Sequence, residues 1–153
     1  MIINRNDLIA PWSNKKLPKN FVASDKTYFV PTESLLQDII YPKFLIWLDT
    51  LNLNKWEHKW DCDNFADAFK LFTCAYYQEN IDSEAEGIAF GVVNYMAELR
   101  AEDGSKGGHA ANIFYIENPN SAVSIDVKFI EPQNGRIYAP TQQEFDSIWT
   151  IYV

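Results

Sequence analysis

The sequence contains few of the residues that build disulfide frameworks, metal sites and nucleic-acid surfaces. Its 153 residues include only two cysteines and two histidines, and 13 lysines and arginines stand against 21 aspartates and glutamates. The resulting net charge of −8 disfavours a nucleic-acid partner, because phosphates are bound by basic surfaces. His58, Cys62 and His109 do not have the spacing of zinc ligands, and structural zinc usually takes four such ligands.

The sequence also lacks long hydrophobic runs. None approaches the ~18 residues that span a membrane, and the N-terminal residues turn polar too early for a secretory signal. Cys62 and Cys74 lie on one predicted helix about 18 Å apart, and a disulfide needs Cα atoms within about 7 Å. Free thiols and no visible signal predict a cytoplasmic protein without a membrane partner, with secretion by another route left open.

The remaining composition is that of a well-packed domain. Hydrophobic residues make up 47% of the chain and aromatic residues 15%, so residues 1–153 are predicted to form a single domain. Residues 1–31 carry three prolines and weak periodicity, and we expect an irregular lead segment with one short strand near Tyr28. The basic cluster at residues 15–19 is interpreted as a solvated loop.

Hydrophobic periodicity predicts helices first and strands afterwards. Thr32 is expected to cap one helix, Pro42 to begin a second, and Asp61 or Cys62 to begin a buried third. Strands are expected at residues 88–96, 109–116, 122–131 and 148–153, with a turn at 118–121 and a capping box from Thr141. The predicted fold class is α+β, with N-terminal helices packed on an antiparallel sheet.

Three residues stand in an order that points to thiol chemistry: Cys62 at a helix start, His109 at the start of a strand, and Glu131 at the end of the next. A helix N-terminus and a nearby imidazolium both stabilise a thiolate, which is the nucleophilic form of cysteine. Asp61 and Asp63 oppose this effect, because flanking carboxylates disfavour a second negative charge. The hypothesis gives Cys62 the attack, His109 the proton transfer and Glu131 the orientation of His109.

Strand geometry selects the third residue. A turn centred near residues 119–120 pairs residues whose numbers sum to 239 or 240, which places His109 opposite Ile130 or Glu131. Glu131 also shares its face with apolar residues that are expected to cover the helix of Cys62, whereas Asp126 is expected to face solvent. Asp126 is therefore the second choice, and a bulge would reverse the preference.

The donors for a developing oxyanion are the next candidates. The backbone N–H of Cys62 is the natural first donor, because it lies at a helix start. A second donor is expected from Gln133, which has the parity of Glu131, or from the segment that ends at Trp60. Trp60 is therefore a candidate substrate-binding residue, although packing is the more frequent role of such a side chain.

The motifs around these residues, Trp60-Asp-Cys-Asp-Asn-Phe-Ala66, Gly108-His-Ala-Ala-Asn112 and Ile130-Glu-Pro-Gln133, together resemble the papain-like domain at the C-terminus of certain fungal agglutinins. The resemblance covers residues 55–145. It implies a papain-like or transglutaminase-like fold, a calcium-stimulated cysteine peptidase, and a triad of Cys62, His109 and Glu131. It also makes Asp61 and Asp63 candidate calcium ligands, although no cofactor is expected to be required.

Two hypotheses of function follow. The first is a cysteine hydrolase that cleaves a peptide or amide bond of a protein or peptide substrate through a thioester acyl-enzyme. The second is a catalytically inactive papain-like module that binds or inhibits a partner, which the carboxylates beside the thiol favour.

Overall fold

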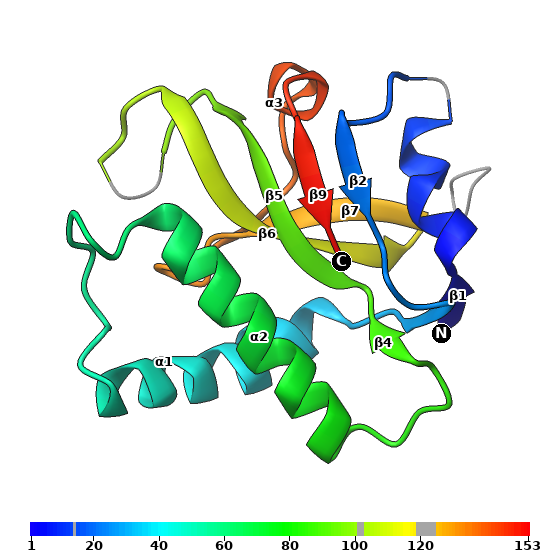
Figure 1. Ribbon diagram of the computed structural model, residues 1–153, viewed down its shortest axis with the longest axis horizontal. Helices are drawn as coiled ribbons and strands as arrows, with labels where there is room; N and C mark the ends of the chain where they lie inside the picture. Colours follow the sequence, from blue (N-terminus) through cyan, green and yellow to red (C-terminus); the bar gives the residue numbers. More distant parts are fainter. Residues whose placement is uncertain (14, 101–102, 119–124) are drawn as a thin grey trace.

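A six-stranded mixed sheet forms the centre of the computed structural model, which describes residues 1–13, 15–100, 103–118 and 125–153 (Figure 1). Its order is β2 (Asn20–Val22), β9 (Thr150–Tyr152), β5 (Phe90–Ala97), β6 (Gly107–Glu117), β7 (Ile125–Ile130) and β8 (Ile137–Tyr138). The strands from β5 to β8 pair in antiparallel fashion, whereas β2 pairs with β9 in parallel. A smaller sheet joins β1 (Ile2–Asn4), β3 (Thr27–Phe29) and β4 (Gly87–Ile88).

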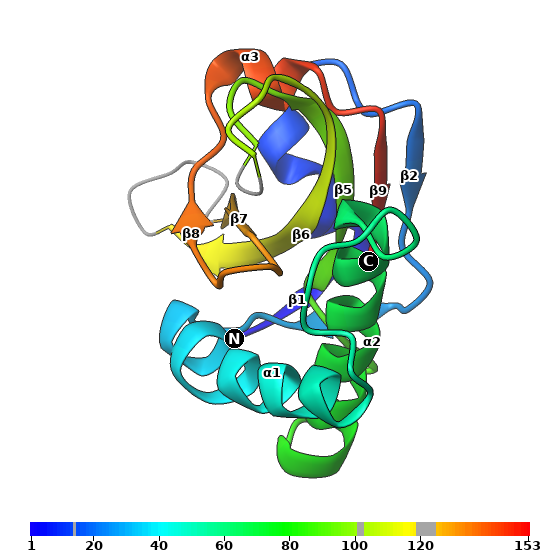
Figure 2. The same ribbon diagram turned by 90° about the vertical axis from the view of Figure 1, so that its left-hand side faces the viewer.

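The helical elements lie on both sides of the central sheet. In chain order they are the 3₁₀ helix η1 (Arg5–Trp12), the π-helix η2 (Leu35–Ile40), α1 (Tyr41–Thr50), α2 (Cys62–Asn80) and α3 (Gln142–Asp146). η2 runs directly into α1, so Pro42 lies within a continuous helical segment, and its missing N–H removes one backbone hydrogen bond where the π-helix changes to an α-helix. Figure 2 shows α1 and α2 together on one side, with η1 and α3 toward the other.

Strand alternation explains why both faces of the sheet are buried. Phe90 and Phe114 point to one face and pack with Phe69 of α2. Tyr95 and Ile113 point to the opposite face, which is covered by residues of η1 and α3. We call these the α2 face and the α3 face of the sheet.

Asn112 joins α2 to the sheet. Its side chain is completely buried on the α2 face, and its Nδ2 donates to the carbonyl oxygens of Ala66 (2.8 Å) and Gly91 (3.1 Å). One amide therefore satisfies a helix carbonyl and a strand carbonyl, which fixes the position of α2.

The predicted arrangement of N-terminal helices on an antiparallel sheet is wrong. The chain begins with β1 and η1, residues 1–31 contribute three strands, and the central sheet is mixed. Strands of three residues carry too little alternation to be detected, and β2 finds its partner at the far end of the chain. The strand expected near Tyr28 is β3, and residues 119–121 of the predicted turn lie outside the described part of the chain.

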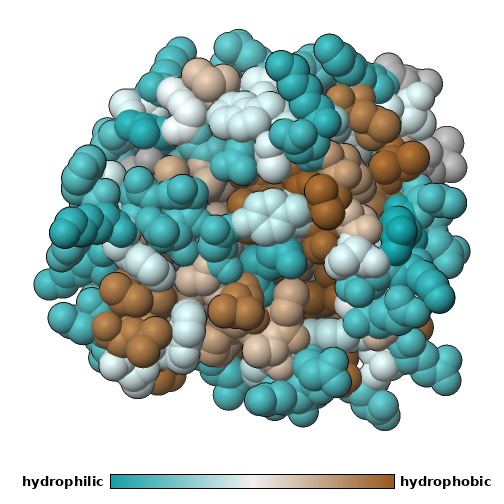
Figure 3. All heavy atoms as spheres, viewed as in Figure 1, coloured by the Kyte–Doolittle hydropathy of each residue, from teal (hydrophilic) through white to brown (hydrophobic). Residues whose placement is uncertain are grey.

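The surface mixes polar and apolar side chains. Figure 3 shows an apolar group at its lower left, on the side where α1 lies, and large side chains exposed on the two long helices include Leu45, Ile46 and Leu71. Within the described ranges, no helix combines the length and hydrophobicity required to cross a bilayer.

Candidate functional site

Cys62 is the first residue of α2, as the sequence predicts. Asp61 precedes it in extended conformation, and the backbone N–H of Asp61 donates to Asn64 Oδ1 (3.2 Å) as half of a capping box. The free thiol is half-buried and packs with Ala66, Ala110 and other residues of the α2 face. The local sequence therefore positions Cys62 through ordinary helix capping.

His109 and Glu131 form a buried pair. Nε2 of His109 lies 2.7 Å from Oε2 of Glu131, and the two side chains are 1% and 0% exposed. The ring of Tyr95 contacts the imidazole edge to face, with centroids 5.8 Å apart. A pair so completely removed from water needs this mutual hydrogen bond, because an uncompensated buried charge is costly.

The register that brings the pair together differs from the predicted one. Asn112 pairs with Ile130, so partner numbers sum to 242 in place of 239 or 240. Continuing this register places Glu131 across from Ala111, and His109 and Glu131 become diagonal neighbours on one face. Asp126 instead lies opposite Ile116 and is exposed.

Cys62 belongs to the other face of the sheet. Alternation along β6 directs Ala110 toward α2 and Cys62, and directs His109 and Ala111 to the α3 face. Cys62 thus contacts the sheet through Ala110, whose side chain and that of His109 alternate along β6. The prediction that the face of Glu131 packs on the helix of Cys62 is wrong, because Val127 and Phe129 on that face pack with residues of η1 and α3.

Of the two predicted substrate-binding residues, Trp60 packs against an aromatic ring and Gln133 makes a backbone hydrogen bond. The indole of Trp60 is half-buried and meets the ring of Phe65 at a centroid distance of 5.7 Å. The backbone N–H of Gln133 donates to Glu131 Oε1 at a long 3.4 Å. Among the described residues, the buried Nε1 of Trp60 and Nε2 of Gln133 have no hydrogen-bond acceptor.

The predicted calcium ligands interact with each other. A hydrogen bond with Asp63, together with burial, raises the pKa of Asp61. Calcium takes six to eight oxygens, and the described part of the chain holds no group of three or more metal-ligating side chains. Calcium binding at Asp61 and Asp63 stays a prediction.

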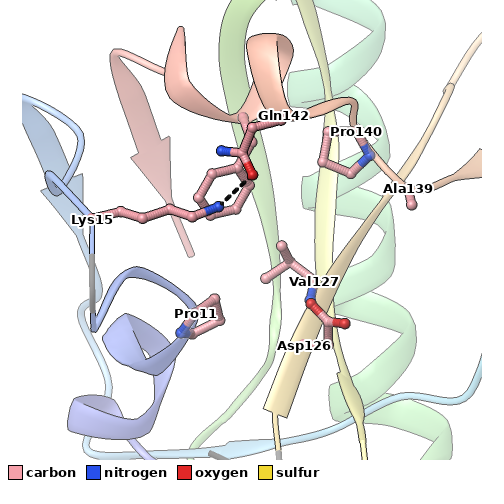
Figure 4. Close-up of a pocket in the computed structure, with 8 residues that line it drawn as sticks. Pro11, Lys15, Asp126, Val127, Ala139, Pro140 and Gln142 are labelled. Atoms are coloured by element: carbon pink, nitrogen blue, oxygen red, sulfur yellow. Dashed lines mark hydrogen bonds between the residues drawn. The ribbon is translucent and has the colours of Figure 1, made fainter. Parts of the chain in front are cut away.

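A hollow that the sequence did not indicate lies between η1, β7 and α3 (Figure 4). This Lys15 pocket has a volume of about 260 Å³ and is lined by Pro11, Lys15, Asp126, Val127, Ala139, Pro140, Gln142 and Phe145. Lys15 reaches across to α3, where its Nζ donates to Gln142 Oε1 (3.0 Å) and lies 4.2 Å from the centroid of the Phe145 ring. Lys15 therefore contacts residues 127 and 130 positions away in the chain, although it lies in a loop whose three lysines are exposed, as the sequence predicts.

Comparisons with known proteins connect the chain with lectins. A family model described as "Ricin-type beta-trefoil lectin C-terminal domain" matches residues 3–152. A solved structure described as a "PSL1a-E64 complex" has a TM-score of 0.69 and 21% identity, over 99% of this chain and 51% of that one. Polyporus squamosus lectin, bound to the human-type influenza-binding epitope Neu5Aca2-6Galb1-4GlcNAc, has a TM-score of 0.62 and 22% identity, over 97% of this chain and 46% of that one. The chain thus spans about half the length of these structures, and no curated protein matches it.

These comparisons overturn the identification as a papain-like cysteine peptidase. The matching family is described as the C-terminal domain of ricin-type beta-trefoil lectins, and at these identities the likeness to the solved structures shows a shared fold. The predicted papain-like fold, cysteine hydrolase activity and peptide substrate are therefore wrong. The roles of Cys62, His109 and Glu131 as site residues stay predictions.

Proposed function

Because the chain belongs to the family of ricin-type β-trefoil lectin C-terminal domains, matched over residues 3–152, we propose that it is a non-catalytic domain that binds carbohydrate. The match over nearly the whole chain is the observation that carries this proposal. It favours the second hypothesis drawn from the sequence, a binding module without turnover, and it names a ligand class for that module.

The packing of the predicted site residues is consistent with a role without catalysis. Cys62 packs with Ala110 on the α2 face. The imidazole of His109 is buried beside Glu131, and the two side chains are 1% and 0% exposed. We assign structural roles to all three side chains.

The Lys15 pocket supplies groups that suit a sugar. Hydroxyl groups donate and accept hydrogen bonds, and here an ammonium donor and an amide meet at Lys15 and Gln142. Pro11 and Val127 add apolar walls that suit the C–H faces of a sugar ring. The volume of about 260 Å³ lies just below that of sites for drug-sized ligands, which favours a single ring.

A glycan array followed by titration calorimetry tests the proposal. The wild-type chain is expected to retain a restricted set of glycans, and Lys15→Ala and Gln142→Ala are expected to weaken the best ligand by about 10- to 100-fold. This range corresponds to the roughly 1.5–3 kcal/mol of a hydrogen bond to a charged group. Lys43→Ala and Gln143→Ala are matched controls, because both residues are exposed and lie outside the pocket.

Cys62→Ala separates binding from thiol chemistry. It is expected to leave glycan affinity unchanged and to cost about 1 kcal/mol of stability, since the thiol is half-buried. Failure of every glycan to bind, or equal affinities for wild type and the two pocket variants, would contradict the proposal.

A further inference from the structure

A second hollow lies beside the C-terminal end of α3. This Trp149 groove has a volume of about 210 Å³ and is lined by Lys16, Leu17, Lys19 and residues 146–149, which include Asp146 and Trp149. Its two walls are joined where the N–H of Asn20 donates to the carbonyl of Trp149 (3.1 Å), just before β2 and β9 begin to pair. The groove is therefore anchored to the central sheet.

Trp149 gives this groove an aromatic side chain that solvent can reach. The indole is 37% exposed, although burying so large an apolar surface is favourable. A Cβ atom on Gly108 would lie 3.8 Å from Cη2 of Trp149, so the start of β6 borders the indole. An aromatic ring kept at the surface beside Lys19 and Asp146 combines an apolar platform with polar neighbours.

α3 connects the two hollows. Gln142 accepts a hydrogen bond from Lys15 in the Lys15 pocket, and its Nε2 donates to Oδ1 of Asp146 (2.7 Å), which lines the Trp149 groove. Lys15 and Lys16 are successive residues that line different hollows. Phe145 and Asp146 are likewise successive residues that line different hollows, so the two hollows adjoin at the C-terminal end of α3.

We propose that the two hollows are adjoining subsites for one oligosaccharide of at least two sugar units. The Lys15 pocket binds one ring through hydrogen bonds to Lys15 and Gln142. The indole of Trp149 binds the next ring through its apolar C–H face, and Lys19 and Asp146 bond the hydroxyls at its edge. This inference rests on the proposed function and specifies its ligand as a chain of sugars, in place of a single one.

The test is a series of ligand lengths measured by calorimetry on wild type and variants. The probes are galactose with Galβ1-4GlcNAc, N-acetylglucosamine with chitobiose, and mannose with mannobiose. In the series that binds, the second sugar is expected to raise wild-type affinity at least tenfold. Trp149→Ala is expected to abolish that gain and to leave monosaccharide affinity within twofold of wild type.

Trp56→Ala is the matched control, because Trp56 is 52% exposed and lies outside both hollows. Lys19→Ala is a second variant in the groove, with an expected loss of about threefold for the disaccharide alone, in case Trp149→Ala folds poorly. Equal wild-type affinities for mono- and disaccharide, or a full gain in both groove variants, overturn the two-subsite inference and leave the proposed function standing. Absence of binding in all three series overturns both.

Discussion

Removing the carboxylate of Glu131 tests whether the buried pair stabilises the fold. The 2.7 Å contact with His109 joins two side chains that are 0% and 1% exposed, so solvent cannot replace the lost partner. Truncating one member of a buried pair typically costs about 3–5 kcal/mol, because the other member keeps its burial and loses its hydrogen bond. We expect Glu131→Ala to lower the free energy of unfolding by that amount.

A conservative variant separates the charge from the volume. Glu131→Gln keeps the shape and can still hydrogen-bond the imidazole, so we expect a smaller loss of about 1–3 kcal/mol. The difference between the two variants includes the cavity left by alanine, whose neighbours on this face include Tyr95 and Phe129.

Urea unfolding followed by tryptophan fluorescence measures both values, with the slope of the transition as a check on two-state behaviour. Glu79→Ala is the control, since this exposed residue of α2 is expected to change stability by less than about 0.5 kcal/mol. A loss below about 1 kcal/mol for Glu131→Ala at unchanged slope would refute the structural role of the pair.

Three further predictions concern other contacts. Asn112→Leu removes two buried hydrogen bonds, to the carbonyls of Ala66 and Gly91, so urea unfolding is expected to show a loss of about 1–3 kcal/mol, and no measurable loss would contradict this. Gly135→Ala is expected to lower the melting temperature, because Gly135 has a φ of 71° and a Cβ there would lie 2.5 Å from the ring of Tyr41; an unchanged melting temperature would count against it. Burial raises the pKa of Tyr41 to about 12 from 10.0, so above pH 10 the unfolded chain loses this proton first and the free energy of unfolding falls as pH rises. In urea unfolding between pH 9 and 11, the free energy of unfolding of Tyr41→Phe should fall less steeply with pH than that of wild type, and identical pH slopes would contradict this.

The elements that could be predicted from the sequence are those with long or specific local patterns. α2 begins at Cys62 because Asp61 and Asn64 form a capping box, and the buried aromatic residues of α2 recur at helical spacing. The capping box at Thr141 begins α3 in the same way, with the N–H of Glu144 donating to Thr141 Oγ1 (3.2 Å). These signals are local, so the residues within one turn of helix determine them.

Non-local features escaped prediction. The parallel pair β2–β9 joins Asn20 to Thr150, and neither three-residue strand has enough alternation to identify its partner. The composition of the turn before β7 does not fix which residue lies at its centre, so the predicted register missed by two to three in the sum of paired residues. The Lys15 pocket could not be predicted either, because Lys15 and Gln142 are 127 residues apart in the chain and meet only in the folded protein.

The candidate site shows the limit of motif order more sharply. Alternation along β6 and β7 predicted that His109 and Glu131 would share a face, and they form a hydrogen bond on that face. The position of α2 relative to the sheet is a tertiary property, decided by Phe69, Asn112 and their neighbours. Strand alternation therefore predicted that His109 and Glu131 lie together, and it could not predict where α2 places Cys62.

The sheet face on which a residue lies determines whether its substitution affects the proposed binding surface. α3 lies on the α3 face through Phe145, and the side chain of Glu144 accepts a hydrogen bond from the N–H of Glu98 just beyond β5 (3.0 Å). The positions of both hollows therefore depend on the face that contains His109 and Glu131. Truncating Glu131 is expected to weaken glycan binding through displacement of α3, whereas Cys62→Ala on the opposite face leaves both hollows unchanged. If the two substitutions weakened binding equally, the hollows beside α3 would not be the binding surface.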